Sequence, residues 1–192
     1  MQPNANSGNS IKMNFFKNRR ILAALVLCCS ILTWQALAET PAIAIPIPNF
    51  HQVNEHVYRG GQPSPETWEH LAKIGVKTVI DLRREGEEEH SVAQEAEAVK
   101  KAGMTYVNVP MKGVVAPTDD QIAKVMALLN TNEPVFVHCK RGSDRTGAVI
   151  ACYRISHDRW QQKQALQEAK SHGMALFQVG LKRYIMTYQP SM

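Results

Sequence analysis

The sequence predicts an α/β domain of three layers, in which helices cover both faces of a central, mostly parallel sheet. Short apolar runs that are typical of buried strands alternate along the chain with longer segments of helical periodicity. Glycine, proline and capping residues separate these segments, as turns do in an alternating fold. The 192 residues contain no internal repeat and no low-complexity segment, which favours one domain of this class.

The strands and the first helix follow from local signals. Apolar runs predict strands over residues 56–59, 76–82, 104–109 and 135–137. The first helix is expected at 65–74, because Ser64 can cap it, Pro65 suits its first position and Gly75 ends it.

The later helices have signals of the same kind. Thr118 and Gln121 form a capping-box pattern for a helix that reaches residue 130. The other helices are expected at 87–102, at 145–157, between an Asp158 cap and Gly173, and at 177–188. Ligands of such sheets bind at the carboxyl ends of the strands, and Cys139 follows one such end.

The N-terminal region has the pattern of an export signal. Basic residues occur between positions 12 and 20, an apolar run covers 21–32, and a small-x-small site occupies 36–38. We therefore predict a signal peptide over residues 1–38 and a periplasmic or secreted mature chain; an uncleaved membrane anchor is the alternative. Residues 39–54 are expected to form an extended, proline-rich lead-in, and residues 55–190 the folded domain.

Removal of this segment changes the charge balance of the chain. The whole sequence has 22 Lys and Arg against 17 Asp and Glu, and residues 1–38 hold four of the basic residues and none of the acidic ones. The mature chain would carry a net charge of +1, which gives no reason to expect a nucleic-acid partner. Cys139 and Cys152 would remain, too few for a disulfide framework.

One segment carries chemistry by itself. Its predicted strand ends at Cys139, and Arg145 follows with the spacing Cys-x5-Arg at the start of an apolar helix. A loop of this length can direct backbone N–H groups at one centre, to which the helix N-terminus adds partial positive charge. These groups and Arg145 favour the thiolate form of Cys139. Gly142 is expected to supply a positive φ or a close backbone approach.

The segment His138–Cys139–x5–Arg145–Thr146–Gly147 resembles the active-site loop of the cysteine-dependent tyrosine and dual-specificity phosphatases. Residues 58–63 and 79–83 are similar to stretches of a compact branch that includes inositol-pyrophosphate phosphatases and bacterial relatives. The resemblance covers about residues 57–188. It implies a dual-specificity-phosphatase-like fold and a metal-independent phosphomonoester hydrolase that needs no cofactor and forms a cysteinyl-phosphate intermediate.

The resemblance also implies roles for residues of the loop. Cys139 would be the nucleophile, and Arg145 would hold the phosphoryl oxygens. Thr146 would stabilise the departing thiolate of Cys139, and His138 would order the loop through hydrogen bonds. The other residues expected to bind substrate are Lys140, Arg141, Gly142 and Ser143.

The positive charges around this loop have two interpretations. Lys140 and Arg141 select a substrate with further negative charge, or they are solvated residues at the rim. Arg83, Arg84 and Lys112 follow strand ends and are also expected at the surface near this rim. The acidic run 87–89 is expected to supply charge at a helix start.

The general acid is not settled by the sequence. Much of the family carries an aspartate about thirty residues before the cysteine, but residues 107–112 contain no carboxylate. The pattern Cys-x-x-Gly-x-Asp-Arg is similar to that of some secreted bacterial tyrosine and lipid phosphatases, which implies Asp144 as the acid. The alternative is Asp119 or Asp120, whose other interpretation is charge stabilisation of a helix start.

Several functions stay open at this point. The substrate is expected to be a phosphoprotein, or alternatively an inositol polyphosphate or a phosphoinositide. A rhodanese-like sulfurtransferase also uses a cysteine in a loop at a helix N-terminus, but its loop is usually one residue shorter than that from Cys139 to Arg145. A catalytically weak phospho-binding module is the third possibility. No metal, nucleic-acid partner or stable membrane span after cleavage is expected.

Overall fold

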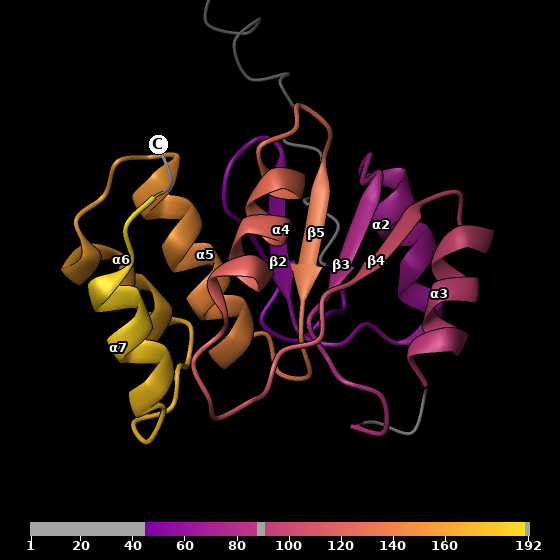
Figure 1. The fold of residues 1–192 in the computed structure, drawn as a ribbon. Helices are drawn as coiled ribbons and strands as arrows, with labels where there is room; N and C mark the ends of the chain where they lie inside the picture. The colour runs from indigo at the N-terminus through magenta and orange to yellow at the C-terminus, as the bar shows by residue number, and fades with distance from the viewer. Residues whose placement is uncertain (1–44, 88–90, 191–192) are drawn as a thin grey trace, which may run out of the picture. The chain divides into compact units, whose positions relative to one another are not determined.

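The computed structural model describes residues 45–87 and 91–190. A five-stranded sheet in the order β1-β2-β5-β3-β4 forms the middle of this region (Figure 1). Its strands are β1 His51–Gln52, β2 Val57–Gly60, β3 Thr78–Asp81, β4 Thr105–Asn108 and β5 Val135–His138. Only β1 is antiparallel to its neighbour, so the predicted mostly parallel sheet is confirmed.

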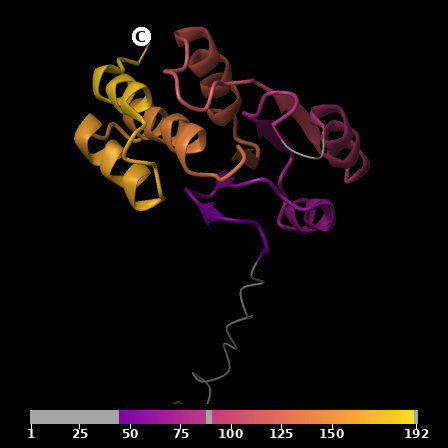
Figure 2. The ribbon, with the colours of Figure 1, turned by 90° about the horizontal axis from the view of Figure 1, so that it is seen from below.

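Helices cover both faces of the sheet, as predicted. They are η1 Pro65–Thr67, α2 Trp68–Lys73, α3 Val92–Lys101, α4 Asp119–Leu129, α5 Asp144–Ser156, α6 Gln162–Ser171 and α7 Val179–Thr187. Seen from the end toward which β5 points, α4 and α5 lie on one side of the sheet and α2 and α3 on the other (Figure 2).

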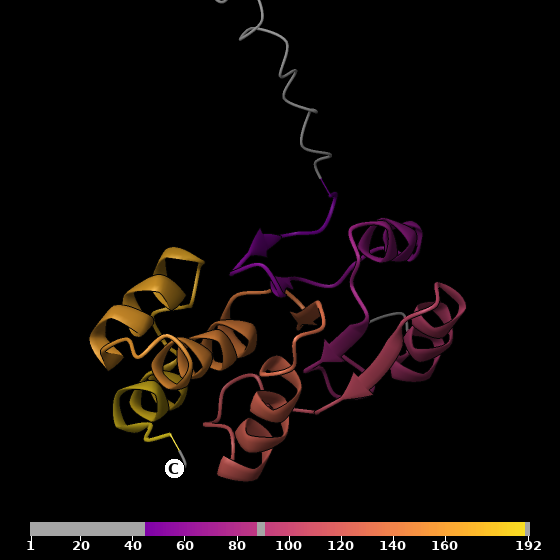
Figure 3. The ribbon, with the colours of Figure 1, turned by 90° about the horizontal axis from the view of Figure 1, so that it is seen from above.

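The alternation of side chains along β5 explains the two layers. Val135 and Val137 belong to the core cluster shared with α4 and α5, whereas Phe136 belongs to the cluster shared with α2 and α3. The view from the opposite end shows the same division (Figure 3). All three side chains are buried, as expected for a parallel strand covered on both faces.

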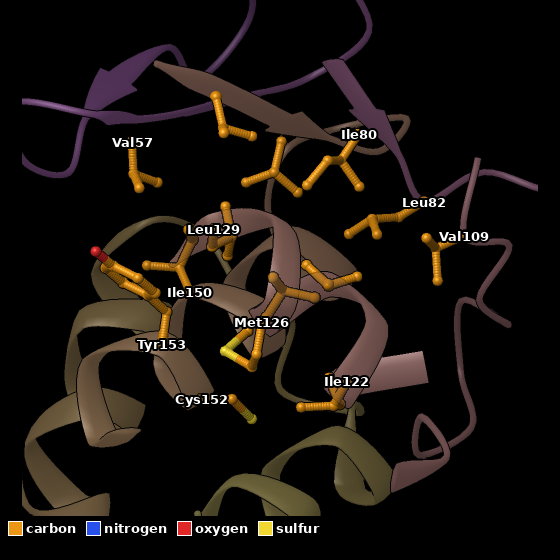
Figure 4. Close-up of a cluster of buried hydrophobic side chains, with 14 of the residues drawn as sticks. Val57, Ile80, Leu82, Val109, Ile122, Met126, Leu129, Ile150, Cys152 and Tyr153 are labelled. Carbon is orange, nitrogen blue, oxygen red and sulfur yellow. The ribbon is translucent and has the colours of Figure 1, made fainter. Parts of the chain in front are cut away.

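The core on the α4 and α5 side positions the helix that follows the predicted loop. Val57 and Ile80 of the sheet lie above Leu129 of α4 and Ile150 and Tyr153 of α5 (Figure 4). All five side chains are buried. Packing of this kind holds the axis of α5, and with it the loop at its N-terminus, in a fixed place relative to β5.

A third cluster surrounds α5 on its other side. Small residues of α5, Ala148 and Ala151, contact α6 and α7, which contribute Ala169 and Leu181 among others. The small side chains let the helices approach closely, and α5 is therefore buried along almost its whole length. The position of its first turn is constrained from two directions.

The segment expected as a lead-in is part of this structure from residue 45 onward. Ile47 is buried in the core beside Phe136, and β1 pairs with β2. The burial of an apolar side chain and the backbone pairing both stabilise this attachment. The predicted signal peptide, residues 1–38, lies outside the described residues and stays a prediction.

Local capping signals were informative in some places and misleading in others. The capping boxes of α3 and α4 are formed by Ser91 and Thr118, and the second confirms its prediction. The prediction of a helix start at residue 87 was wrong, because α3 begins after Ser91. Asp158 does not cap α6; its carboxylate pairs with Arg154, and α6 begins only after Gln161. Across the described ranges, no helix is both long and apolar enough to span a bilayer.

Candidate active site

A small cavity opens where β5 ends and α5 begins. It has a volume of about 200 Å³, and Cys139 lies in its wall. Its lining residues are Gly113, Val114, Cys139, Lys140, Arg141, Asp144, Arg145, Phe177 and Gln178. The structure thus brings the predicted nucleophile, arginine, in-loop aspartate and both loop cations to one place. Cys139 itself is 2% exposed and has a free thiol.

The loop is clamped from outside through its carbonyl groups. The Gly142 carbonyl accepts hydrogen bonds from Arg59 Nη2 at 2.7 Å and Asn49 Nδ2 at 3.0 Å, and the Lys140 carbonyl accepts from Gln62 N at 3.1 Å. In a trans peptide the C=O and the following N–H point in opposite directions. The N–H groups of Arg141 and Ser143 therefore point away from these clamping residues, as an anion cradle requires.

Gly142 has both a positive φ and a close approach to neighbouring backbone, the two features of which the sequence predicted at least one. Its φ is +70°, in the left-handed region that favours glycine. A Cβ at this position would lie 2.5 Å from Gly61 N and closer still to the carbonyl carbon of Gly60. The close approach of the loop to the end of β2 thus depends on the absence of a side chain.

Arg59 is a functional candidate that sequence reasoning missed. The side chain is 1% exposed, and Nη2 is bound to the loop carbonyl, while Nε and Nη1 have no hydrogen-bond partner within the described residues. Burial lowers the pKa of Arg59 to about 10, so the guanidinium is disfavoured by its surroundings yet charged at neutral pH. A buried cation beside the loop favours an anion in it. The sequence signal that could have identified Arg59 was its position, as a charged residue, within a predicted strand.

Arg145 is held with one edge occupied and the other open. Its Nη1 donates to the carbonyls of Leu82 and Met111, both at 3.2 Å, and lies 2.7 Å from Glu87 Oε2. The described residues provide no partner for Nε or Nη2. This free edge matches the fork geometry with which arginine binds two oxygens of a phosphoryl group.

Glu87 orients this arginine rather than capping a helix. Burial tends to raise the pKa of Glu87, but hydrogen bonds from Arg145 and Arg84 outweigh it and lower the pKa below its usual value. The carboxylate is therefore ionised at neutral pH and fixes the Nη1 edge. The prediction that this acidic run serves a helix start was wrong for Glu87, since four residues lie between it and α3, and its carboxylate pairs with Arg145.

The candidate acids differ in their relation to Cys139. Asp144 lies at the first position of α5 and lines the cavity; Oδ1 accepts from Ala175 N at 2.8 Å and Oδ2 pairs with Arg141. Asp119 accepts a hydrogen bond from Tyr184 at 2.7 Å and lines a different cavity beside α7. Asp120 is exposed in the first turn of α4. Asp144 is the carboxylate that shares the cavity with the thiol.

Two hydroxyl groups of the loop have contrasting environments. Thr146 is fully buried in the first turn of α5, and its Oγ1 has no hydrogen-bond partner among the residues described. A buried hydroxyl without a partner is a donor available to a nearby thiolate. Ser143 does not cap α5 with its side chain; its Oγ lies near Asn49 and Gly173 and donates to the Arg141 carbonyl of the loop at 3.4 Å.

Behind the loop lies a buried network of charged side chains. His138 Nε2 is 2.9 Å from Glu95 Oε1, and Arg83 pairs with both Glu95 and Asp81. Burial tends to raise the pKa of Asp81, but His138 and Arg83 outweigh it and lower that pKa. His138 also stacks on Phe136. Neither ring nitrogen of His138 has a hydrogen-bond partner among the described residues, so its ordering of the loop through hydrogen bonds stays a prediction.

This network corrects the prediction for Arg83, and its hydrogen bonds bear on whether Asp81, Glu95 and His138 form a metal site. Arg83 was expected at the surface but is 1% exposed. Asp81, Glu95 and His138 offer three potential metal ligands that lie within 4.8 Å of one another. The carboxylates already accept hydrogen bonds from Arg83, and Tyr106 donates to Asp81 at 2.7 Å. The cluster is thus explained as a network of ion pairs within the protein.

Comparisons with known proteins agree with this geometry. Inositol diphosphatase DSP5 of Arabidopsis thaliana is 30% identical over 133 residues, which cover 66% of this chain and 62% of that protein. The chain therefore spans less than two thirds of the length of this curated relative.

Solved structures have the same fold. The core catalytic domain of the PP-IP phosphatase SIW14 from S. cerevisiae has a TM-score of 0.63 at 25% identity, with 76% of this chain and 88% of that chain covered. P. aeruginosa TpbA has a TM-score of 0.62 at 22% identity, with 74% and 86% covered.

The match to a protein family extends well beyond the loop. The family described as "DSP-PTPase phosphatase fused to NAD+ Kinase" matches residues 43–182, from before β1 into α7. This range includes the strands, the loop and the helices that hold it. The chain therefore belongs to this DSP-PTPase family.

Proposed function

We propose that this chain is a metal-independent phosphomonoester hydrolase that acts through a cysteinyl-phosphate intermediate. The observation that carries the proposal is the cavity that Cys139 and Arg145 share, with the contacts of Arg145 to Leu82 and Glu87 made through Nη1. The Cys139 thiolate attacks phosphorus in line; the S–P bond forms as the P–O bond to the leaving group breaks. Arg145 and the loop N–H groups stabilise the charge on the equatorial oxygens.

Other residues serve the proton transfers and the second step. Asp144 donates a proton to the leaving oxygen, and its carboxylate then removes a proton from the water that attacks phosphorus. The S–P bond breaks in this second step, and the hydroxyl of Thr146 stabilises the departing thiolate. The products are the alcohol or phenol and inorganic phosphate.

Two substrate classes are proposed for this reaction, a phosphorylated inositol and a phosphoprotein. Relatives that carry the names inositol diphosphatase and PP-IP phosphatase support a phosphorylated inositol, and Lys140 and Arg141 at the cavity suit a polyanionic substrate. A phosphoprotein is the other candidate, supported by the family's description as a DSP-PTPase.

Turnover of p-nitrophenyl phosphate, with and without EDTA, tests the proposal. We expect hydrolysis that EDTA leaves unchanged and that vanadate inhibits, because positive groups of the protein supply the charge stabilisation. Transfer of sulfur from thiosulfate would instead identify a sulfurtransferase. Tight phosphate binding without turnover would identify a phospho-binding module.

Asp144→Asn tests the general acid. The amide keeps an oxygen that can accept from Ala175 N but carries no proton to give, so hydrolysis of alkyl phosphates should fall by about 100-fold or more. Hydrolysis of p-nitrophenyl phosphate should fall much less, because its leaving group needs little protonation. Steady-state kcat on both substrates measures the difference.

Arg141→Gln is the matched control for this variant. It also removes the ion pair with Asp144 but retains the carboxylate, so the ratio of the two rates should stay near that of the unmodified protein. A silent Asp144→Asn, together with the leaving-group dependence in Asp119→Asn or Asp120→Asn, would reject Asp144 as the acid.

A further inference from the structure

The exposed large apolar side chains are concentrated beside the active-site cavity. Six such residues occur in the part of the chain that the structure describes, and five of them lie in residues 114–115 and 176–179. They are Val114 (68% exposed), Val115 (50%), Leu176 (88%), Phe177 (68%) and Val179 (61%), with Met186 (38%) as the sixth. We call the first five the apolar rim. A gathering of this kind marks an interaction surface more often than scattered single residues do.

The two segments of the apolar rim lie side by side. Gln178 Nε2 donates to the Gly113 carbonyl at 2.8 Å, and a Cβ on Gly180 would lie 3.1 Å from Ala116 N. Both segments lie at the end of the domain toward which β5 points (Figure 1). Val114 and Phe177 also line the cavity that contains Cys139. The apolar surface therefore begins at the mouth of the active site.

The charges near the apolar rim have one predominant sign. Residues 107–117 and 169–192 contain no aspartate or glutamate, but Lys112 and Arg183 flank the two segments and are exposed. Lys140 and Arg141 lie on the cavity wall. Asp119 and Asp120, the carboxylates nearest in sequence, belong to α4, where Asp119 accepts from Tyr184. Asp144 lines the cavity and accepts from Ala175 N, but its charge is paired with that of Arg141. The surface around the apolar side chains is thus suited to an anionic partner.

We propose that the apolar rim docks the domain on an anionic lipid bilayer, so that a phosphomonoester on a lipid headgroup enters the cavity. The proposal rests on the proposed function and names its substrate class. Protruding aliphatic and aromatic side chains surrounded by lysine and arginine fit the interface of a bilayer, where apolar groups insert and cations meet phosphate groups. Leu176, with 88% of its surface exposed, protrudes as an inserting residue would.

The bilayer explains the geometry better than a peptide does. A peptide that binds in an extended or helical form needs a groove or a sheet edge. The apolar rim instead consists of exposed side chains on two adjacent loops and on the first residue of α7, Val179. Insertion of these loops would bring Cys139 toward the headgroup layer without any change in the loop that binds phosphate.

The test compares hydrolysis of the same phosphorylated headgroup on a vesicle lipid and as a free soluble molecule. Vesicles of phosphatidylcholine and phosphatidylserine that contain a phosphatidylinositol monophosphate are supplied to the protein, in parallel with the corresponding soluble inositol phosphate. We expect kcat/KM on the vesicle substrate to exceed that on the soluble headgroup by at least about tenfold, because docking concentrates the enzyme at the surface. The protein should also sediment with the vesicles.

A double variant isolates the contribution of the apolar rim. Leu176→Gln/Val179→Gln should remove most of the vesicle advantage and reduce sedimentation, while hydrolysis of p-nitrophenyl phosphate changes little, because neither side chain lines the cavity. Met186→Gln is the matched control, since Met186 is an exposed apolar residue of α7 outside the rim. That variant should keep the vesicle advantage.

Other results would overturn the proposal. Equal kcat/KM on vesicles and on the soluble headgroup would do so. A rim-dependent rate on a phosphotyrosyl peptide, without vesicle binding, would assign the surface to a protein partner. A dimer that dissociates in the double variant would assign it to a second copy of the chain. Absence of turnover on every substrate would refute the proposed function, while sedimentation would still test docking.

Discussion

Cys139→Ser is expected to lower kcat by roughly 10⁴-fold or more on every substrate. A serine hydroxyl is a far weaker acid than a thiol, so the loop that favours a thiolate does not produce an alkoxide at neutral pH. The adjacent His138 lies beside Glu95 and stacks on Phe136, and we expect no general-base role for it. Arg145 and the N–H groups remain, so the variant should still bind inorganic phosphate.

Cys152→Ser is the matched control for this substitution. Both cysteines of the described residues are free and buried, but Cys152 belongs to the core cluster of α4 and α5. Burial raises the pKa of Cys152, so its thiol is inert at neutral pH. We expect near-normal kcat with a stability loss of about 1 kcal/mol, the cost of a buried hydroxyl without a good partner. Substantial turnover in Cys139→Ser would exclude the covalent mechanism.

Gly142→Ala should damage both stability and catalysis. The left-handed φ of +70° costs an alanine about 1–2 kcal/mol. The overlap of its Cβ with the backbone at Gly60 and Gly61 adds roughly 1–3 kcal/mol. Relief of the overlap must move the loop relative to β2, and a shift near 1 Å in such a site lowers the rate by on the order of 100-fold. Urea unfolding and kcat/KM on p-nitrophenyl phosphate measure the two effects.

Gly103→Ala separates the effect of the positive φ from the effect of the Cβ overlap with neighbouring backbone. Gly103 also has a positive φ, +82°, but a Cβ there meets no atom within 4 Å, and the residue follows α3 at a distance from the loop in sequence. The variant should lose only the conformational contribution and keep its kcat/KM. Equal losses of stability in the two variants, with unchanged rates, would show that the close approach to β2 has no role.

The loop was predictable because its chemistry is written in consecutive residues. The spacing from Cys139 to Arg145, the apolar strand before it and the helix after it all follow from the local sequence. The positive φ of Gly142 follows from the same reasoning. Helix starts with a complete local signal, such as Thr118 with Gln121, were also predictable.

The residues that support the loop were not predictable, because they meet only in the folded chain. Arg59 reaches a carbonyl 83 positions away, and Glu87 meets an arginine on another element. Arg83 is followed by charged residues and resembles a surface arginine, yet its partners Asp81 and Glu95 bury it. A single sequence shows that a charge is present but not which opposite charge will come near it.

The buried Arg59 has a consequence for the folding equilibrium. Its guanidinium is buried, and two of its nitrogens lack hydrogen-bond partners within the described residues, so Glu168 and Cys139 offset its charge only in part. An oxyanion held by the loop would offset that charge and would bind the native chain but not the unfolded one. By mass action, an anion at about 100 times its dissociation constant adds about 2.7 kcal/mol to the free energy of unfolding. Substrate and product would thereby act as stabilisers of the enzyme, and its thermal resistance would vary with the phosphate content of its surroundings.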